Sequence, residues 1–138
     1  MIDNKGLLDI LRIIIMGIIG ILERLFGGYD TVFFSLVIFM SLDYMTGVLS
    51  AIVNRKLNSK LGGIGLLKKF GILSVIAMTV IIEKDILCTT GIRDAVILYY
   101  ISNEGISILE NLCYIGVPVP AIIKNVLKNM NEENDTRK

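Results

Sequence analysis

The sequence predicts an all-α integral membrane protein with three to four transmembrane helices and an amphipathic C-terminal helix on the cytoplasmic side. Of its 138 residues 54% are apolar, more than a soluble domain of this size could bury, because small domains keep a large surface in water. Residues 31–53 form an apolar run whose only charged residue is Asp43, and a helix of this length can cross a bilayer. No alternating strand pattern or internal repeat occurs, so residues 1–138 are expected to form a single membrane domain.

The first hydrophobic segment, residues 7–26, contains a charge-free run at 13–22 that is too short to cross the bilayer by itself. Charged residues flank this run, so the segment is either a span with its charged ends at the two surfaces or a helix in the interface. The pair Gly27-Gly28 is expected to end the helix, because glycine readily adopts the left-handed conformation of a C-cap. The next segment, residues 31–53, is the clearest span.

A basic stretch leads into the third span, which is predicted at residues 66–83. Residues 54–69 carry five basic side chains and no acidic one, and positively charged loops tend to stay in the cytoplasm. The two lysines that end this stretch are expected to extend their charged heads to the cytoplasmic surface. The basic residues expected to fix the topology are Arg55, Lys56, Lys60, Lys68 and Lys69.

The fourth predicted span, residues 92–117, is unusually polar for a membrane helix. Pro118 and Pro120 are expected to end it, because proline lacks the backbone donor that a helix interior needs. Residues 121–130 show an amphipathic pattern typical of a helix on the membrane surface, and the charged tail at 131–138 is predicted to be disordered. The loops at residues 27–30 and 83–91 contain few basic residues and are placed outside the cell. Two spans separate the basic loop at 54–69 from the C-terminus, so the C-terminus is placed in the cytoplasm as well.

Polar residues form one stripe on each of two predicted spans. A carboxylate at the centre of a span costs roughly 2.5–3.5 kcal/mol on insertion scales, so Asp43 and Glu104 are not expected to face lipid. No lysine or arginine is expected at the same depth. The stripes therefore form either a packing seam inside one subunit, or a seam between subunits or a water-filled lumen. The first stripe is Asp43, Thr46, Gly47 and Ser50, and the second is Tyr100, Glu104, Ser107 and Asn111.

The composition argues against catalysis, metal binding and nucleic-acid binding. Histidine, the commonest metal ligand and a frequent general base, is absent. The net charge of +1 gives no sign of the basic face that nucleic acids require. Cys88 and Cys113 match neither a metal-site spacing nor a redox motif, and they are expected to be buried small hydrophobic residues. No catalytic residue, metal ligand or cofactor is predicted.

Two blocks of sequence carry a family resemblance. Residues 42–69, LDYMTGVLSAIVNRKLNSKLGGIGLLKK, contain an aspartate-x-x-x-glycine helix followed by a short basic loop. Residues 101–120, ISNEGISILENLCYIGVPVP, form a glutamate-bearing helix that ends in G-x-P-x-P. In these two blocks the chain resembles the toxin-secretion and phage-lysis holins of clostridia and related Gram-positive bacteria and their phages. The resemblance covers most of the chain after residue 30.

The resemblance implies a non-enzymatic holin that oligomerises in the bacterial cytoplasmic membrane and forms lesions for the release of an endolysin or a large toxin. Its partners would be the lipid bilayer, further copies of the chain and the passing cargo, with no nucleic acid and no cofactor. Short spans and central carboxylates suit helices that become stable only in an oligomer. Two other functions remain open, a small ion-coupled multi-helix transporter or channel and a membrane adaptor that forms no pore.

Overall fold

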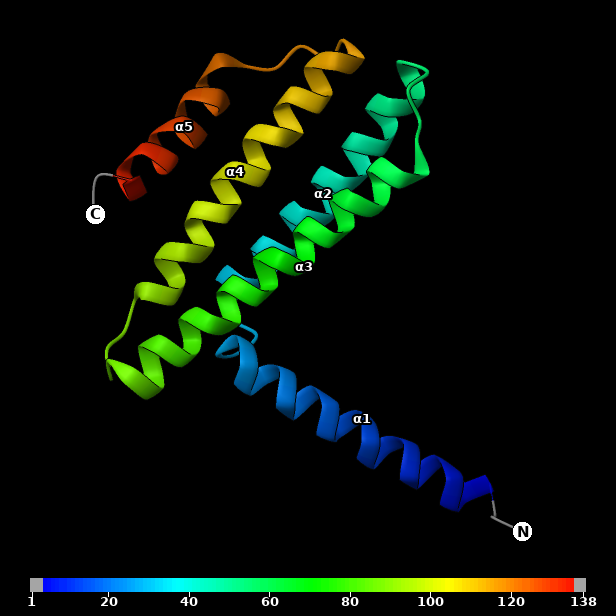
Figure 1. The fold of residues 1–138 in the computed structure, drawn as a ribbon, viewed down its shortest axis with the longest axis vertical. Coiled ribbons are helices and arrows are strands. Elements are labelled where there is room, and N and C mark those ends of the chain that lie inside the picture. The colour runs from blue at the N-terminus through cyan, green and yellow to red at the C-terminus, as the bar shows by residue number, and fades with distance from the viewer. Residues whose placement is uncertain (1–3, 136–138) are drawn as a thin grey trace.

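The computed structural model describes residues 4–135, and all regular structure in this range is helical, which confirms the predicted all-α class. Helices α2 (Thr31–Val53), α3 (Ser59–Ile81) and α4 (Ile92–Ile115) form an antiparallel bundle (Figure 1). A turn of π-helix, η1 (Ile82–Ile86), extends α3. Helix α1 (Asn4–Phe26) leaves one end of the bundle, and α5 (Ala121–Asp135) folds back beside α4.

Local sequence signals account for where the bundle helices begin and end. The Asp30 side chain caps α2 by accepting from the Phe33 N–H at 2.9 Å. The Asn58 side chain caps α3 in the same way, accepting from the Lys60 N–H at 2.9 Å. Helix α4 ends at Gly116, which has a φ of 92° and so adopts the left-handed conformation that glycine tolerates best.

A small apolar core holds the three bundle helices together in the half of the bundle nearest to α1. Its buried members are Phe33, Leu36 and Met40 of α2, Ile76 of α3, and Ile97 and Ile101 of α4. The outward faces of α2 and α3 instead expose large apolar side chains such as Phe34, Met45 and Phe70. The helical segments Thr31–Val53 and Ser59–Ile86 are long and apolar enough to cross a membrane.

The structure corrects two of the predicted boundaries. Helix α3 begins at Ser59 and not at 66, so the glycine-rich stretch that looks like a loop is helical and the connection after α2 is short. Asn58 caps the N-terminus of α3, a signal that the glycines among residues 62–65 made easy to overlook. The predicted disorder of 131–138 is wrong for residues 131–135, which continue α5, and residues 136–138 lie outside the described range.

Candidate functional site

Three charged side chains from three different helices meet in the middle of the bundle. Asp43 lies on α2, Lys69 on α3 and Glu104 on α4, each close to the midpoint of its helix. The Lys69 Nζ atom donates to Asp43 Oδ2 at 2.5 Å and also to Glu104 Oε2. The three side chains are only 9% to 15% exposed. We refer to these three residues as the charged cluster.

The charged cluster overturns the expectation that no basic residue lies at the depth of the two carboxylates. That expectation placed Lys69 near the start of its helix, with its ammonium group at the cytoplasmic surface. Because α3 begins at Ser59, Lys69 is three turns inside the helix and faces α2 and α4. Its neighbour Lys68 is exposed.

An amide from α4 completes the contacts of Asp43. The Asn111 Nδ2 atom lies 3.3 Å from Asp43 Oδ1, 3.4 Å from the Asp43 carbonyl oxygen and 3.3 Å from Thr46 Oγ1. Asn111, a member of the predicted stripe on α4, therefore donates hydrogen bonds directly to two members of the predicted stripe on α2. The Asp43 carboxylate accepts from both neighbouring helices, which fixes the position of α2 against α3 and α4.

The remaining stripe residues follow the same seam. Gly47 faces Asn111, and a Cβ atom at Gly47 would lie 3.5 Å from the amide nitrogen. Ser50 is buried near the end of α2, and Tyr100 and Ser107 line the space beside the charged cluster. The structure thus brings the two predicted stripes together inside a single chain.

Burying the charged cluster requires free energy, and removing one of its members from the folded bundle requires more. Two carboxylates and one ammonium group have a formal charge of −1 when all three are ionised. Removing one partner of a buried ion pair is strongly destabilising, because it leaves a charge without compensation. The hydrogen bonds from Asn111 help to compensate the second carboxylate, and the whole arrangement favours a state in which α2, α3 and α4 stay together.

A partly open cavity of about 620 Å³ adjoins the charged cluster between α2, α3 and α4. Its lining includes all three members of the charged cluster together with Lys56, from the short connection after α2, and Lys68. The Tyr44 side chain extends from α2 across this space to α3. Its hydroxyl oxygen lies 3.6 Å from the position that a Cβ atom on Gly62 would occupy. The helices are therefore less tightly packed on this side of the cluster than in the apolar core.

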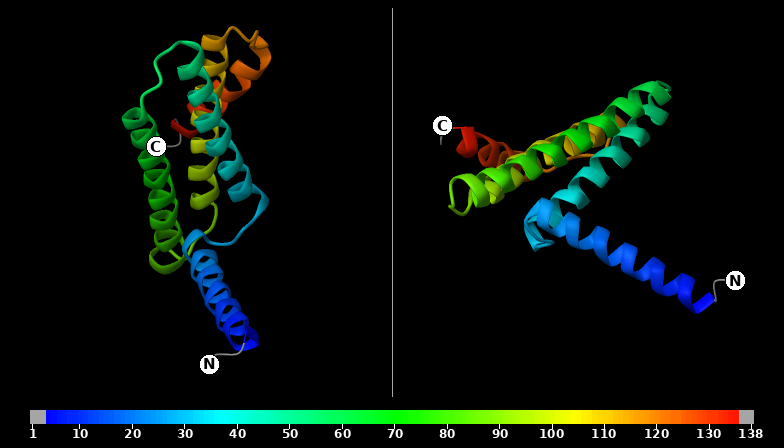
Figure 2. Two further views of the ribbon diagram at one scale, coloured as in Figure 1. Left: turned by 90° about the vertical axis from the view of Figure 1, so that its right-hand side faces the viewer. Right: turned by 60° about the horizontal axis from the view of Figure 1, so that its bottom comes forward.

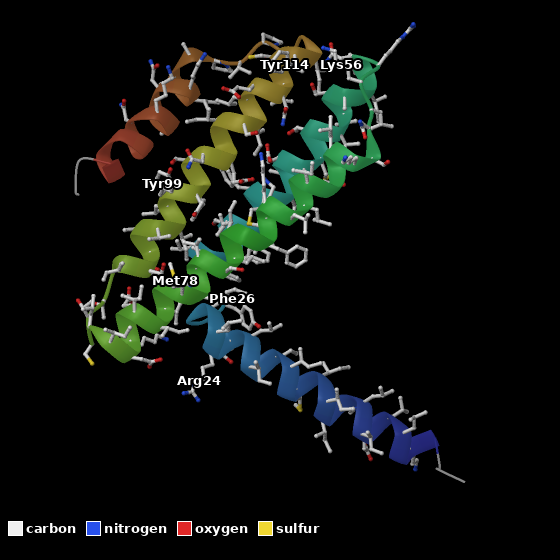
Figure 3. All side chains as sticks on the ribbon, in the orientation of Figure 1. Arg24, Phe26, Lys56, Met78, Tyr99 and Tyr114 are labelled. Atoms are coloured by element: carbon white, nitrogen blue, oxygen red, sulfur yellow. The ribbon has the colours of Figure 1, made fainter. Side chains whose placement is uncertain are left out.

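Most of the predicted topology residues lie at one end of the bundle. Arg55, Lys56 and Lys60 are exposed in and after the connection between α2 and α3. Pro118 and Pro120 lie in the connection between α4 and α5, as expected for residues that end a helix. Figure 3 shows that Lys56 and Tyr114, which is at the end of α4, lie at the same end of the bundle.

A second charged group, which we call the Arg93 network, lies at the opposite end of the bundle. The Arg93 guanidinium donates to the carbonyl oxygens of Phe26 at 2.7 Å and Gly28 at 3.1 Å, and to the Asp30 carboxylate at 2.6 Å. Asp94 accepts from the same guanidinium at 2.8 Å. Only 5% of Arg93 is exposed, so this side chain joins the turn between α1 and α2 to the start of α4.

The turn of π-helix after α3 contributes to the same network. It places the buried Glu83 carboxylate 2.6 Å from the backbone nitrogen of Arg93, where it accepts a hydrogen bond from the first turn of α4. The side-chain hydrogen bond from Arg93 lowers the pKa of Asp30 below its usual value of 3.8, against the opposing effect of partial burial.

Sequence reasoning missed the Arg93 network and misplaced the cysteines. Neither Arg93 nor Asp94 belongs to a polar stripe, and the partners of their side chains lie at least 63 residues away or directly next to them in sequence, so helix periodicity gave no signal for this group. Cys88 and Cys113 are exposed and form no disulfide, not buried as expected. Among the side chains that the structure describes, no group of acidic or cysteine residues is arranged to hold a metal ion.

A sequence model of the bacteriophage holin family matches residues 20–132 of the chain. The chain belongs to the bacteriophage holin family. It is 37% identical over 116 residues to an uncharacterized protein of Clostridium perfringens, covering 82% of this chain and 84% of that protein. It is 39% identical over 118 residues to an uncharacterized protein of Listeria innocua, covering 86% and 84%. A probable holin of Bacillus phage phi105 is 33% identical over 96 residues, covering 70% and 71%. No solved structure matches.

Membership of the holin family confirms the resemblance carried by residues 42–69 and 101–120. Together with the two apolar helices it indicates a membrane protein. The matched range contains the charged cluster and the Arg93 network, whereas most of α1 precedes it. The family match therefore covers the end of α1, the bundle α2–α4 and most of α5.

Proposed function

We propose that this holin-family chain oligomerises in the bacterial cytoplasmic membrane and forms lesions through which an endolysin or a large toxin leaves the cell. The family match and the relative named as a probable holin support the class of protein. The single observation that carries the proposal is the charged cluster in the middle of the bundle. Ionisable side chains at such a depth face other helices or water, so the helices that bear them can line a wet passage.

The proposed topology places α2, α3 and α4 across the membrane. Two of these helices are apolar enough to cross by themselves, and α4 accompanies them because its polar stripe packs against their seam. The basic connection at residues 54–58 lies in the cytoplasm by the positive-inside rule. The connection from α4 to α5 lies at the same end, which places the start of α5 on the cytoplasmic side, from where the helix folds back beside α4.

The pairing of Lys69 changes the physical basis for assembly. Within one chain, Asp43 and Glu104 share the Lys69 ammonium, so the two carboxylates do not by themselves require neighbouring copies. The paired arrangement is instead the closed state, in which the chain can accumulate in the membrane without forming a passage. Opening then requires the cluster to separate, so that its charged groups face water or the polar seams of adjacent copies.

A wet lumen removes the main cost of that separation. In a dry bilayer each unpaired charge would lose its partner without gaining hydration, which is strongly unfavourable. When several copies assemble around a lumen, the same groups can be hydrated on the side that faces this lumen. The apolar faces of α2 and α3 stay against lipid. Assembly and opening are therefore coupled, because only in the oligomer does hydration of the charged groups compensate for the loss of their ion pairs.

The experiment is induced expression in a bacterium with and without a cytoplasmic muralytic enzyme. The proposal predicts that membrane potential is lost in both cultures and that lysis occurs only when the enzyme is present. A cytoplasmic reporter protein of defined size should appear in the medium of osmotically protected cells. Retention of that reporter, or lysis to the same extent without the enzyme, would contradict the proposal.

A small ion-coupled transporter is the second candidate, and the cavity beside the charged cluster is the observation that favours it. The cavity brings two carboxylates and an ammonium group to a space that is partly open, as a coupling site requires. This alternative predicts ion flux that depends on a small substrate, with no escape of proteins. The reporter measurement above separates the two functions directly.

A further inference from the structure

Four of the five charged side chains of α1 lie on one stripe, and Arg24 lies outside it. Lys5, Asp9, Arg12 and Glu23 are separated by four, three and eleven residues, spacings that place all four on one side of an α-helix. Arg12 and Asp9 form an ion pair on this side at 3.4 Å. Most other positions are isoleucine or leucine, and residues 7–25 are all exposed. A wide apolar face of α1 therefore has no cover within the described part of the chain.

The direction of α1 places this face at the end of the bundle. The helix departs crosswise from the bundle and does not return along α2 (Figures 1 and 2). Figure 3 shows Phe26, in the last turn of α1, pointing towards the bundle, while Arg24 points away from it. The Phe26 ring stacks on the ring of Phe33 with centroids 4.9 Å apart.

Several contacts hold α1 in this direction. The Arg93 network fixes the carbonyl oxygens of Phe26 and Gly28, and Gly27 has a φ of 77° that a residue with a side chain rarely adopts. The Tyr29 hydroxyl donates to the Ile19 carbonyl oxygen at 3.3 Å, which ties the turn back to the middle of α1. The departure of α1 is therefore built from specific contacts between the turn, α1 and α4.

We propose that α1 lies in the membrane–water interface, with its apolar face in the acyl chains and its charged stripe in the water. Its partner is a phospholipid surface, on the side of the membrane opposite to residues 54–58. This inference rests on the proposed crossing of α2–α4. If these helices are upright, a helix that leaves their end crosswise runs along the bilayer surface, and an apolar face continuous with the lipid-facing bundle turns towards the lipid. Tyr29 suits this boundary, where aromatic side chains with a polar tip are enriched.

The test uses tryptophan as a depth probe, because the sequence contains no tryptophan and each variant therefore has a single one, whose emission can be excited apart from that of the tyrosines. The variants Leu11→Trp, Ile18→Trp and Leu25→Trp place the probe at three positions seven residues apart on the apolar face of α1. Leu42→Trp is the matched control at the middle of α2, where the native side chain is exposed. Each full-length variant is reconstituted in phospholipid vesicles that contain lipids brominated at a defined acyl carbon.

An interfacial α1 predicts the same quenching profile at all three positions, with the strongest quenching by bromines near the headgroup. The Leu42→Trp control should be quenched most by bromines near the end of the acyl chain. A spanning α1 would instead put Ile18→Trp deepest, with the other two near the surfaces, and that profile would overturn the inference. Equal fluorescence with and without bromine at all three positions would place α1 in water and would also overturn it.

A further variant tests the face and not only the depth. Met16→Trp lies on the side of the charged stripe, so it should be quenched several-fold less than Ile18→Trp, two residues away. Equal quenching of these two probes would contradict the proposed orientation. A shallow Leu42→Trp control would show that α2 does not cross the membrane; the proposed function would then fail, and this inference with it. A deep control with a central Ile18→Trp rejects only the inference.

Discussion

Replacement of Lys69 by methionine tests whether the charged cluster holds the closed state. Methionine keeps a long, unbranched side chain but removes the ammonium group that both carboxylates contact. Asp43 and Glu104 then keep their mutual repulsion and lose their shared cation. Expected results are a less stable bundle and an earlier loss of membrane integrity after induction.

The magnitude follows from the burial of the cluster. Removing one partner of a buried ion pair costs roughly 3–5 kcal/mol. The side chains keep 9% to 15% exposure and a carboxyl group can take up a proton, so we expect a loss near the lower end, about 3 kcal/mol. A loss of this size weakens the closed state by roughly a hundredfold, since 1.4 kcal/mol corresponds to a factor of ten.

The measurements are the free energy of unfolding in detergent and the time from induction to lysis in cells that also make a muralytic enzyme. Lys68→Met is the matched control, because it removes the same charge from an exposed neighbour and should change stability by less than about 0.5 kcal/mol. Combining Lys69→Met with Asp43→Asn and Glu104→Gln should recover most of the loss, since the uncompensated charges are gone. The reasoning is refuted if Lys69→Met unfolds like the native chain, or if the triple variant is no more stable than Lys69→Met.

Three further predictions concern the seam, the Arg93 network and the topology. Gly47→Leu should destabilise the bundle by about 1–3 kcal/mol in the same unfolding assay, because its larger side chain enters the contact with Asn111, whereas Gly47→Ala should be tolerated. The lowered pKa of Asp30 means that its pairing with Arg93 stabilises the fold fully above about pH 4, the usual range for an aspartate, and is lost as the pH falls through the folded-state pKa. When the free energy of unfolding is measured as a function of pH, the Asp30→Asn variant should therefore show a smaller decrease at low pH than the native chain. An equal decrease in both would count against the pairing. In a variant without its other cysteine, Cys88 should react with a membrane-impermeant maleimide on intact cells, because it lies exposed at the end of the bundle opposite to residues 54–58. Labelling only after permeabilisation would invert the proposed topology.

Helix positions were largely predictable because their signals are local. The apolar run at residues 31–53 matches α2 residue for residue, and Gly27, Pro118 and Pro120 mark the helix ends as expected. The start of α3 was not predictable in the same way. Its glycines favour a loop by propensity, but a backbone in lipid must satisfy its hydrogen bonds internally, which favours a continuous helix from Ser59 onwards.

The candidate site was only half predictable. Periodicity identified Asp43 and Asn111 as members of two polar stripes, because residues on one helix face can be found from spacing alone. The partner of the two carboxylates could not be found in this way. Its identification depends on where α3 begins and how α3 is rotated against α2 and α4, and both are properties of the packed bundle.

The sequence by itself determined that the chain is helical and apolar, that its polar residues follow two helix faces, and that it resembles the holins. Only the tertiary structure decided that these faces meet within one chain, that Lys69 compensates both central acids, and that Arg93 fixes the direction of α1. The physical reason is the range of the interactions. Hydropathy, capping and periodicity are set by residues close in sequence, whereas these ion pairs join residues 26 to 63 positions apart and exist only once the helices have packed.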